Sequence, residues 1–329
     1  MKTLPQTQSV MNVENLSVRF EIGQKTLWDR PQYLHAVRDV SFKVRPARTL
    51  GIVGESGSGK TTTAMATIGL QSAYRGRVEF GGRDLLGLSR EEWRAVRRDL
   101  QVIFQDPYSS LNPRDRVGTA VREPMDLTAF GDKGDRPARV AELFNLVGLR
   151  PDQMSLFPHQ FSGGQRQRIS IARALATQPE LIVCDEPVSA LDVAIQAQIL
   201  NLLRRLQDEM GLSYLFISHD LGVVQFICDD ILVMYLGEVV EHATRQEIFG
   251  DPKHPYTRAL LDSAPSLARR KSAGYKRQAA LAGDPPSPVD LPQGCAFAGR
   301  CAHVKALCRQ EKPRLRREGG RAVACHFPV

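Results

Sequence analysis

An eight-residue segment between an apolar stretch and a predicted helix has the spacing of a phosphate-binding loop, G-x-x-x-x-G-K-[ST]. Its glycines let the backbone curl so that N–H groups and the positive helix end face a phosphate. Lys60 can contact the β and γ oxygens of a nucleoside triphosphate, and the Thr61 hydroxyl can bind magnesium. The predicted nucleotide-binding residues are Gly54, Glu55, Ser56, Gly57, Ser58, Gly59, Lys60, Thr61 and Thr62.

A pair of carboxylates ends a later apolar stretch, Leu181 to Cys184. There Asp185 can hold magnesium, and Glu186 can polarise an attacking water. By itself, an Asp-Glu pair at a strand end is about as often an ordinary exposed turn. Upstream, a run of small residues at a helix start exposes backbone N–H groups to a second anion. That run is Ser162, Gly163, Gly164 and Gln165.

The elements that must position these residues alternate between strand and helix patterns. Short apolar runs predict buried strands at 50–53, 181–184 and 215–217, and helical periodicity covers 62–70, 165–176 and 195–210. This alternation predicts an α/β fold with a mainly parallel sheet and nucleotide at the carboxyl ends of its strands. Earlier strands at 12–20 and 36–44 predict an antiparallel edge, and 231–240 predicts a hairpin.

Composition narrows the class of protein. The chain has 329 residues, of which 42% are hydrophobic and 24% charged, as in folded globular proteins of one or two domains. We see no targeting segment and no apolar run that could cross a bilayer. The basic excess lies entirely in residues 266–329, with 13 Lys and Arg against 4 Asp and Glu. We therefore expect no nucleic-acid partner for the main body.

The six cysteines fall into two groups. Cys184 and Cys228 lie in apolar runs and are predicted to be small core residues. The other four crowd into the last 35 positions with the spacing C-x5-C-x6-C-x16-C. In a chain without a secretion signal, such a group favours a metal or iron–sulfur centre over disulfides. Four thiolates suit either 4Fe-4S or zinc, and free cysteines remain an alternative; the four are Cys295, Cys301, Cys308 and Cys325.

One chain cannot easily place both phosphate-binding elements on the same nucleotide unless a partner chain contributes one of them. From Val13 to Gly250, the chain resembles the nucleotide-binding subunits of ABC transporters. The match includes Gln105, the segment Ser189 to Asp192, and His219. The resemblance implies a P-loop ATPase domain at 12–250, comprising a RecA-like core, an antiparallel β subdomain and a helical signature subdomain at about 106–177. Two such domains would meet head to tail, each ATP lying between one phosphate loop and the other's Ser162–Gln165.

The resemblance also implies roles for single residues. Glu186, His219 and Gln105 would be catalytic; Thr61, Gln105 and Asp185 would hold Mg²⁺; Asp192 would belong to the nucleotide-binding D-loop. For the aromatic that stacks on adenine, Phe20 best matches the family's position, with Trp28 and Tyr33 as rivals.

Two further segments, 105–114 and 254–260, resemble the ATPases of bacterial oligopeptide and dipeptide importers, and residues near Trp28 and Trp93 favour the F-type subunit. This resemblance implies a peripheral subunit on the cytoplasmic face of the inner membrane. It also implies a D-type ATPase partner, two transmembrane permease subunits and an external solute-binding protein. Residues 251–329 would be the family's C-terminal domain, which carries a 4Fe-4S cluster in some members.

Alternatives stay open for the transported solute and for the class of protein. Related importers carry nickel, glutathione or opine-type compounds. A soluble ABC ATPase with a redox-sensing tail is a further hypothesis. It fits less well, because those ATPases usually have two cassettes or a long coiled-coil insertion, and this chain has neither.

Overall fold

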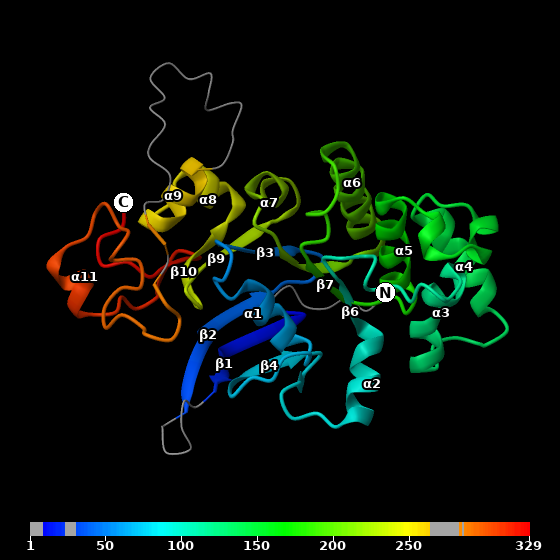
Figure 1. Cartoon of the computed structure of the whole chain (residues 1–329), viewed down its shortest axis with the longest axis horizontal. Helices are drawn as coiled ribbons and strands as arrows, with labels where there is room; N and C mark the ends of the chain where they lie inside the picture. Colours follow the sequence, from blue (N-terminus) through cyan, green and yellow to red (C-terminus); the bar gives the residue numbers. More distant parts are fainter. Residues whose placement is uncertain (1–8, 24–30, 264–282, 285) are drawn as a thin grey trace. The chain divides into compact units, whose positions relative to one another are not determined.

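The structure is a computed structural model that describes residues 9–23, 31–263, 283–284 and 286–329 (Figure 1). The chain divides into two compact units, each made of segments that are distant in sequence. We call the first the helical unit; it comprises Met1–Asn12, Lys43–Thr49 and Glu79–Ile217. The second is the phosphate-loop unit, which comprises Val13–Phe42, Leu50–Val78 and Ser218–Val329.

The phosphate-loop unit contains two sets of strands. In one, the neighbours are β2 (Gln32–Val44), β1 (Met11–Ile22) and β4 (Arg75–Phe80), in that order. In the other, the order is β3 (Thr49–Val53), β9 (Asp230–Tyr235), β10 (Glu238–Thr244), β12 (Arg321–Val323) and β11 (Arg316–Glu318). β3 is buried at every position and pairs with β9 in parallel, as its unbroken apolar run predicts.

The C-terminal residues are part of the phosphate-loop unit. β12 pairs antiparallel with β10, with Val323 opposite Glu241. Figure 1 shows this segment, in orange and red, beside β10 and α9. The predicted domains 12–250 and 251–329 stay a prediction. The structure groups residues 218–329 with the phosphate loop in one compact unit. Among the described residues of this unit, the helices are α1 (Lys60–Thr67), α7 (Leu221–Ile227), α8 (Arg245–Gly250), α9 (Pro255–Ser263) and α11 (Ala306–Gln310).

The helical unit contains three parallel strands in the order β6 (Leu100–Ile103), β7 (Leu181–Asp185), β8 (Ser213–Ile217), as the strand–helix alternation predicts. A short strand β5 (Arg83–Asp84) pairs with the end of β4. The remaining elements are α2 (Arg90–Asp99), α3 (Val117–Thr128), α4 (Arg136–Leu146), η1 (Pro151–Ser155), η2 (Pro158–Gln160), α5 (Gly163–Leu175) and α6 (Val193–Met210).

Local sequence signals set the ends of these helices. Ser89 begins α2 with a reciprocal capping box to Glu92. Gly211 ends α6 in the left-handed conformation, with φ of 68°, as its position after the apolar helix face predicts. Among the described residues, no helix combines the length and the apolar character that crossing a membrane requires.

The core of the helical unit gives a prediction for stability. Leu203 on α6 is fully buried, so Leu203→Ala removes apolar contacts and leaves a cavity. We expect it to lower the free energy of unfolding by about 3 kcal/mol, measured by urea denaturation. Leu127→Ala on α3 is the control, because Leu127 is 66% exposed and its truncation should change stability by under about 0.5 kcal/mol. Equal effects of the two substitutions would contradict the packing described here.

Candidate functional site

The phosphate loop joins the end of β3 to the start of α1, and its shape requires glycine at two close approaches. Gly54 has φ of 154°, and a Cβ there would lie 2.3 Å from the Met234 carbonyl oxygen. Gly59 has φ of 96°, and a Cβ there would lie 2.3 Å from the Ala36 carbonyl oxygen. A side chain at either position would displace the backbone of a neighbouring strand, so the loop conformation depends on these glycines.

The loop concentrates positive charge at the start of α1. Lys60 is only 6% exposed, and its ammonium donates to the carbonyl oxygens of Gly54 and Glu55 at 3.0 and 2.8 Å. Gly59 occupies the N-cap of α1 and supplies no side-chain cap, and the first turn contains no acidic residue. Ser58 Oγ is buried without a hydrogen-bond partner among the described residues. These features suit an anion that accepts hydrogen bonds, such as a phosphate.

His219 belongs to the same unit as the loop. The Ser218 N–H donates to the Ile52 carbonyl oxygen at 3.3 Å, which ties the residue before His219 to β3 close to the start of the loop. The His219 side chain is exposed. The structure therefore places this predicted residue beside the strand from which the phosphate loop leaves.

The predicted carboxylate pair lies in the helical unit, at the carboxyl end of β7. Gln105 Nε2 donates to Glu186 Oε2 at 3.0 Å, so these two predicted residues meet although 81 positions separate them. Asp185 is buried. Glu186 has φ of 46°, an uncommon conformation for a residue with a side chain, and its N–H donates to the Ile217 carbonyl at 3.0 Å. Local strain of this kind is concentrated at functional sites.

The second predicted anion cradle begins α5, also in the helical unit. Ser162 and Gln165 form a capping box, in which Ser162 Oγ accepts from Gln165 N–H and Gln165 Oε1 accepts from Ser162 N–H. Ser162 and Gly163 are exposed, whereas Gly164 packs so tightly on α6 that a Cβ would lie 2.5 Å from Ile195. The cradle thus presents its first two residues to solvent and buries the third.

Asp192, predicted to bind nucleotide, has a structural role here. Its Oδ1 accepts from the Ile195 N–H at 3.0 Å, which makes it the N-cap of α6. The preceding Ser189 donates from its hydroxyl to the Glu186 carbonyl oxygen at 3.1 Å. The D-loop is therefore anchored to the residue that carries the proposed catalytic carboxylate.

The candidates for an adenine-stacking aromatic are distributed over the N-terminal strands. Phe20 on β1 is 39% exposed, which leaves its ring accessible to a base. Tyr33 lies over the Arg19 guanidinium at 4.0 Å, and Tyr74 lies over the same group at 4.5 Å. Trp28 lies outside the described residues. The stacking role of Phe20 stays a prediction.

The cysteines separate as the sequence predicts. Cys184 and Cys228 are fully buried, and Cys228 packs against Gly51 on β3. The four C-terminal cysteines line one cavity together with His254, Phe297 and His303. Burial and the three neighbouring thiols raise the pKa of Cys295 to about 11. None of the six cysteines, all of which are described, forms a disulfide.

The thiols of this cavity are not arranged as a finished metal site. Among the described residues, no group of three or more His, Cys, Asp or Glu side chains has a geometry that could hold a metal ion. The donor set itself suits a metal, since four cysteines share one cavity wall. The predicted 4Fe-4S or zinc site therefore stays a prediction.

Comparison with known proteins agrees with this geometry. Residues 37–189 match the family model of the ABC transporter, and residues 240–308 match that of the oligopeptide/dipeptide transporter C-terminal region. The oligopeptide transport ATP-binding protein OppF of Salmonella typhimurium is 47% identical over 98% of this chain and 97% of its own length. The chain belongs to the ABC transporter ATP-binding proteins.

Other relatives cover this ABC ATPase equally well. The oligopeptide transport ATP-binding protein AppF of Bacillus subtilis is 43% identical over 99% of both chains, and the di/tripeptide transport ATP-binding protein DppF of Pseudomonas aeruginosa is 41% identical over 97% of this chain and 98% of its own. A solved dimeric ATP-binding cassette with ADP and phosphate bound matches with a TM-score of 0.63 and 28% identity, covering 71% of this chain and 98% of that one. The predicted ABC ATPase fold and ATPase activity are confirmed, whereas the small C-terminal cysteine-containing domain stays a prediction.

Two residues near the phosphate loop of this ABC ATPase were not predicted as part of its site. Tyr256 Oη accepts from the Glu55 N–H at 2.9 Å, and Arg300 forms two hydrogen bonds with the Glu55 carboxylate, the Nη2–Oε1 bond being 3.0 Å long. Tyr256 and Arg300 are 201 and 245 positions from Glu55 in sequence. The one available signal was position, since Tyr256 lies in the segment 254–260 and Arg300 directly precedes Cys301.

The carboxylate edge gives a prediction for catalysis. Glu186→Gln keeps the size of the side chain but removes the charge predicted to polarise water, so ATP should still bind while its hydrolysis in the assembled complex falls by a factor of about 100 or more. Glu180→Gln is the control, because Glu180 lies just before β7, at the opposite end of the same strand. Normal turnover in the Glu186 variant would remove this residue from its assigned role.

Proposed function

We propose that this ABC ATPase energises the uptake of oligopeptides or dipeptides by a bacterial importer. The observation that carries the proposal is the extent of the likeness to peptide transport ATP-binding proteins, 47% identity over 98% of the chain for OppF. The matching C-terminal region of oligopeptide/dipeptide transporters supports the same solute class, because the ABC family model alone is shared by transporters of other solutes.

ATP is proposed to bind between two cassettes, this one and that of a second ATPase subunit. The phosphate loop supplies Lys60 and the N-terminal N–H groups of α1, and Ser162 and Gly163 lie exposed at the start of α5, where a second molecule can use them. Magnesium neutralises phosphate charge when bound. Thr61, Gln105 and Asp185 are proposed to hold it, since they offer a hydroxyl, an amide oxygen and a buried carboxylate.

Hydrolysis then depends on side chains of this chain that act on the attacking water and on the γ-phosphate. Glu186, oriented by the Gln105 amide, accepts a hydrogen bond from water and aligns it for attack. His219 contacts the γ-phosphate and stabilises the charge that develops on it. Once the γ-phosphate is cleaved, the contacts that join the two cassettes weaken, and the dimer opens. This cycle converts ATP hydrolysis into a movement of the permease.

The proposed complex contains a D-type ATPase as the second cassette, two transmembrane permease subunits and an external solute-binding protein. We place this subunit on the cytoplasmic face of the inner membrane, peripherally bound. Permease helices are proposed to dock near residues 105–114, where the Tyr108 side chain is 54% exposed. A large exposed aromatic in a loop is the kind of residue that anchors a protein interface.

We further propose that the four C-terminal cysteines hold a 4Fe-4S cluster, with zinc as the alternative. Support comes from the shared cavity and from the Cys295 N–H, which donates to the Cys308 carbonyl oxygen at 2.8 Å and so holds two of the four residues together. The bound cluster or zinc ion would stabilise residues 295–329, whose regular structure is one short helix and two short strands.

Peptide uptake tests the main proposal. The complete complex, reconstituted in vesicles with ATP inside, should accumulate labelled di- or oligopeptides, and Lys60→Ala should abolish accumulation because phosphate binding is lost. Nickel, glutathione and an opine serve as competing solutes in the same assay. Accumulation of one of these in place of peptides would overturn the proposed solute class while leaving the ATPase assignment intact.

Metal content tests the cysteine site. Protein purified without oxygen should contain iron and acid-labile sulfide and absorb visible light, and Cys301→Ser or Cys325→Ser should lose both signals. Cys228→Ala is the matched control, since Cys228 is buried against β3 and lies outside the group. Zinc in place of iron would select the alternative, and protein without either element would reject the site.

A further inference from the structure

Glu55, the second residue of the phosphate loop, is held from two sides by residues close to the C-terminus. Its N–H donates to Tyr256 Oη on α9, and its carboxylate accepts two hydrogen bonds from the Arg300 guanidinium. Arg300 Nη1 to Glu55 Oε2 is 2.6 Å, and Arg300 Nη2 to Glu55 Oε1 is 3.0 Å. This is the bidentate geometry in which an arginine–carboxylate pair is strongest.

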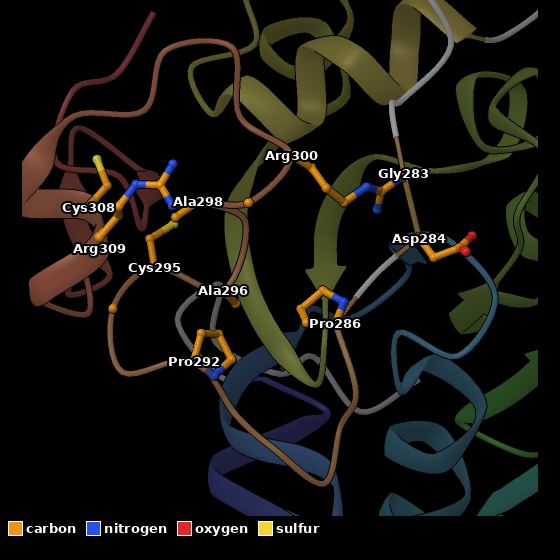
Figure 2. Close-up of a pocket in the computed structure, with 12 residues that line it drawn as sticks. Gly283, Asp284, Pro286, Pro292, Cys295, Ala296, Ala298, Arg300, Cys308 and Arg309 are labelled. Atoms are coloured by element: carbon orange, nitrogen blue, oxygen red, sulfur yellow. The ribbon is translucent and has the colours of Figure 1, made fainter.

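The pair is shielded from water on its arginine side. The Arg300 side chain is 6% exposed and that of Glu55 is 26% exposed. Figure 2 shows the Arg300 side chain extending away from Cys295, Cys308 and Arg309. Its guanidinium also lies 5.8 Å from the centre of the Tyr235 ring. A shielded bidentate pair has a defined geometry, so it can fix the position of a backbone loop.

An aromatic cluster holds the pair in place. Tyr235 comes from the end of β9, Tyr256 from α9 and Phe297 from the segment between Cys295 and Cys301. The three ring centres lie 4.7 to 5.4 Å apart. Packing of aromatic rings at these distances is favourable beyond the area it buries. Because Phe297 and Arg300 belong to one seven-residue segment, the cluster and the ion pair form a single connection to the phosphate loop.

We propose that Arg300 is a positioning residue for ATP binding, through which residues 295–329, here called the cysteine segment, hold and neutralise Glu55 in the phosphate loop. The proposal rests on the proposed assignment of this loop as the ATP site. Without Arg300, the Glu55 carboxylate would stay close to the triphosphate with no compensating charge and would repel it. The loop would also lose the contact that fixes the segment preceding Lys60, whose ammonium bonds the Glu55 carbonyl.

Equilibrium binding to the full-length chain tests the proposal, with a fluorescent ATP analogue and magnesium as the probe. We expect Arg300→Ala to weaken binding roughly tenfold, as loss of one partner of a shielded charge pair should. Arg300→Lys keeps a charge and should recover part of the loss. Arg309→Ala is the matched control, because it removes an exposed cation from the same segment and should bind the analogue as the unmodified chain does.

A double-substitution cycle separates positioning from general destabilisation. If the two side chains act as one unit, Glu55→Gln added to Arg300→Ala should not weaken binding further and should recover most of it, since the uncompensated charge is gone. Thermal unfolding of each variant checks that the chain is folded. Unchanged affinity in Arg300→Ala, or effects that simply add, would overturn the proposal.

Two further variants complete the test. Lys60→Ala tests the ATP site separately from the role of Arg300. If Lys60→Ala binds the ATP analogue normally, the assignment of the ATP site fails. If Lys60→Ala loses binding while Arg300→Ala does not, only the role of Arg300 is rejected. Cys301→Ser alters the residue next to Arg300 and should weaken binding in the unmodified chain but have no added effect in Arg300→Ala. An equal effect in both backgrounds would contradict the connection through Arg300.

Discussion

The phosphate loop must hold a backbone conformation that its own residues do not stabilise. Gly54, Gly57 and Gly59 all have positive φ, and a short glycine-rich segment has many other conformations of similar energy. The loop is held instead by its surroundings. The Gly237 N–H in the β9–β10 turn donates to the Ser58 carbonyl at 3.0 Å, and Tyr256 and Arg300 fix Glu55. The conformation of the phosphate loop therefore depends on contacts from segments that follow residue 230.

A comparable constraint acts on the carboxylate edge of the helical unit. Parallel pairing brings the ends of β6 and β7 to the same edge, so Gln105 and Glu186 come within hydrogen-bond distance. Glu186 keeps an uncommon backbone conformation, which costs about 1–3 kcal/mol in general. Its N–H bond to Ile217 and the Ser189 bond to its carbonyl hold it there. The Glu186 carboxylate, which we propose to be catalytic, is thus oriented by its strand neighbours.

The cysteine segment is a structural part of the phosphate-loop unit. Its strand β12 pairs with β10 in the sheet that also contains β9 and β3. Its Arg300 side chain bonds Glu55 in the phosphate loop, and its Phe297 ring packs on Tyr256. A segment with one short helix and two short strands needs other contacts to stay folded, and its aromatic and arginine side chains provide them. The same contacts that stabilise this segment therefore also shape the phosphate loop.

The sequence by itself determined the chemistry and most of the elements. The spacing of Gly54 to Thr61, the acidic pair after β7 and the small residues at the start of α5 identified the ATPase, because each depends on neighbours within a few residues. Helix ends such as Gly211 were predictable for the same reason. The Asp192 cap of α6 is equally local, since it joins residues only three positions apart. Only the tertiary structure showed that Tyr256 and Arg300 hold Glu55, because these residues lie 201 and 245 positions from it and no local pattern encodes which distant side chain will meet which loop.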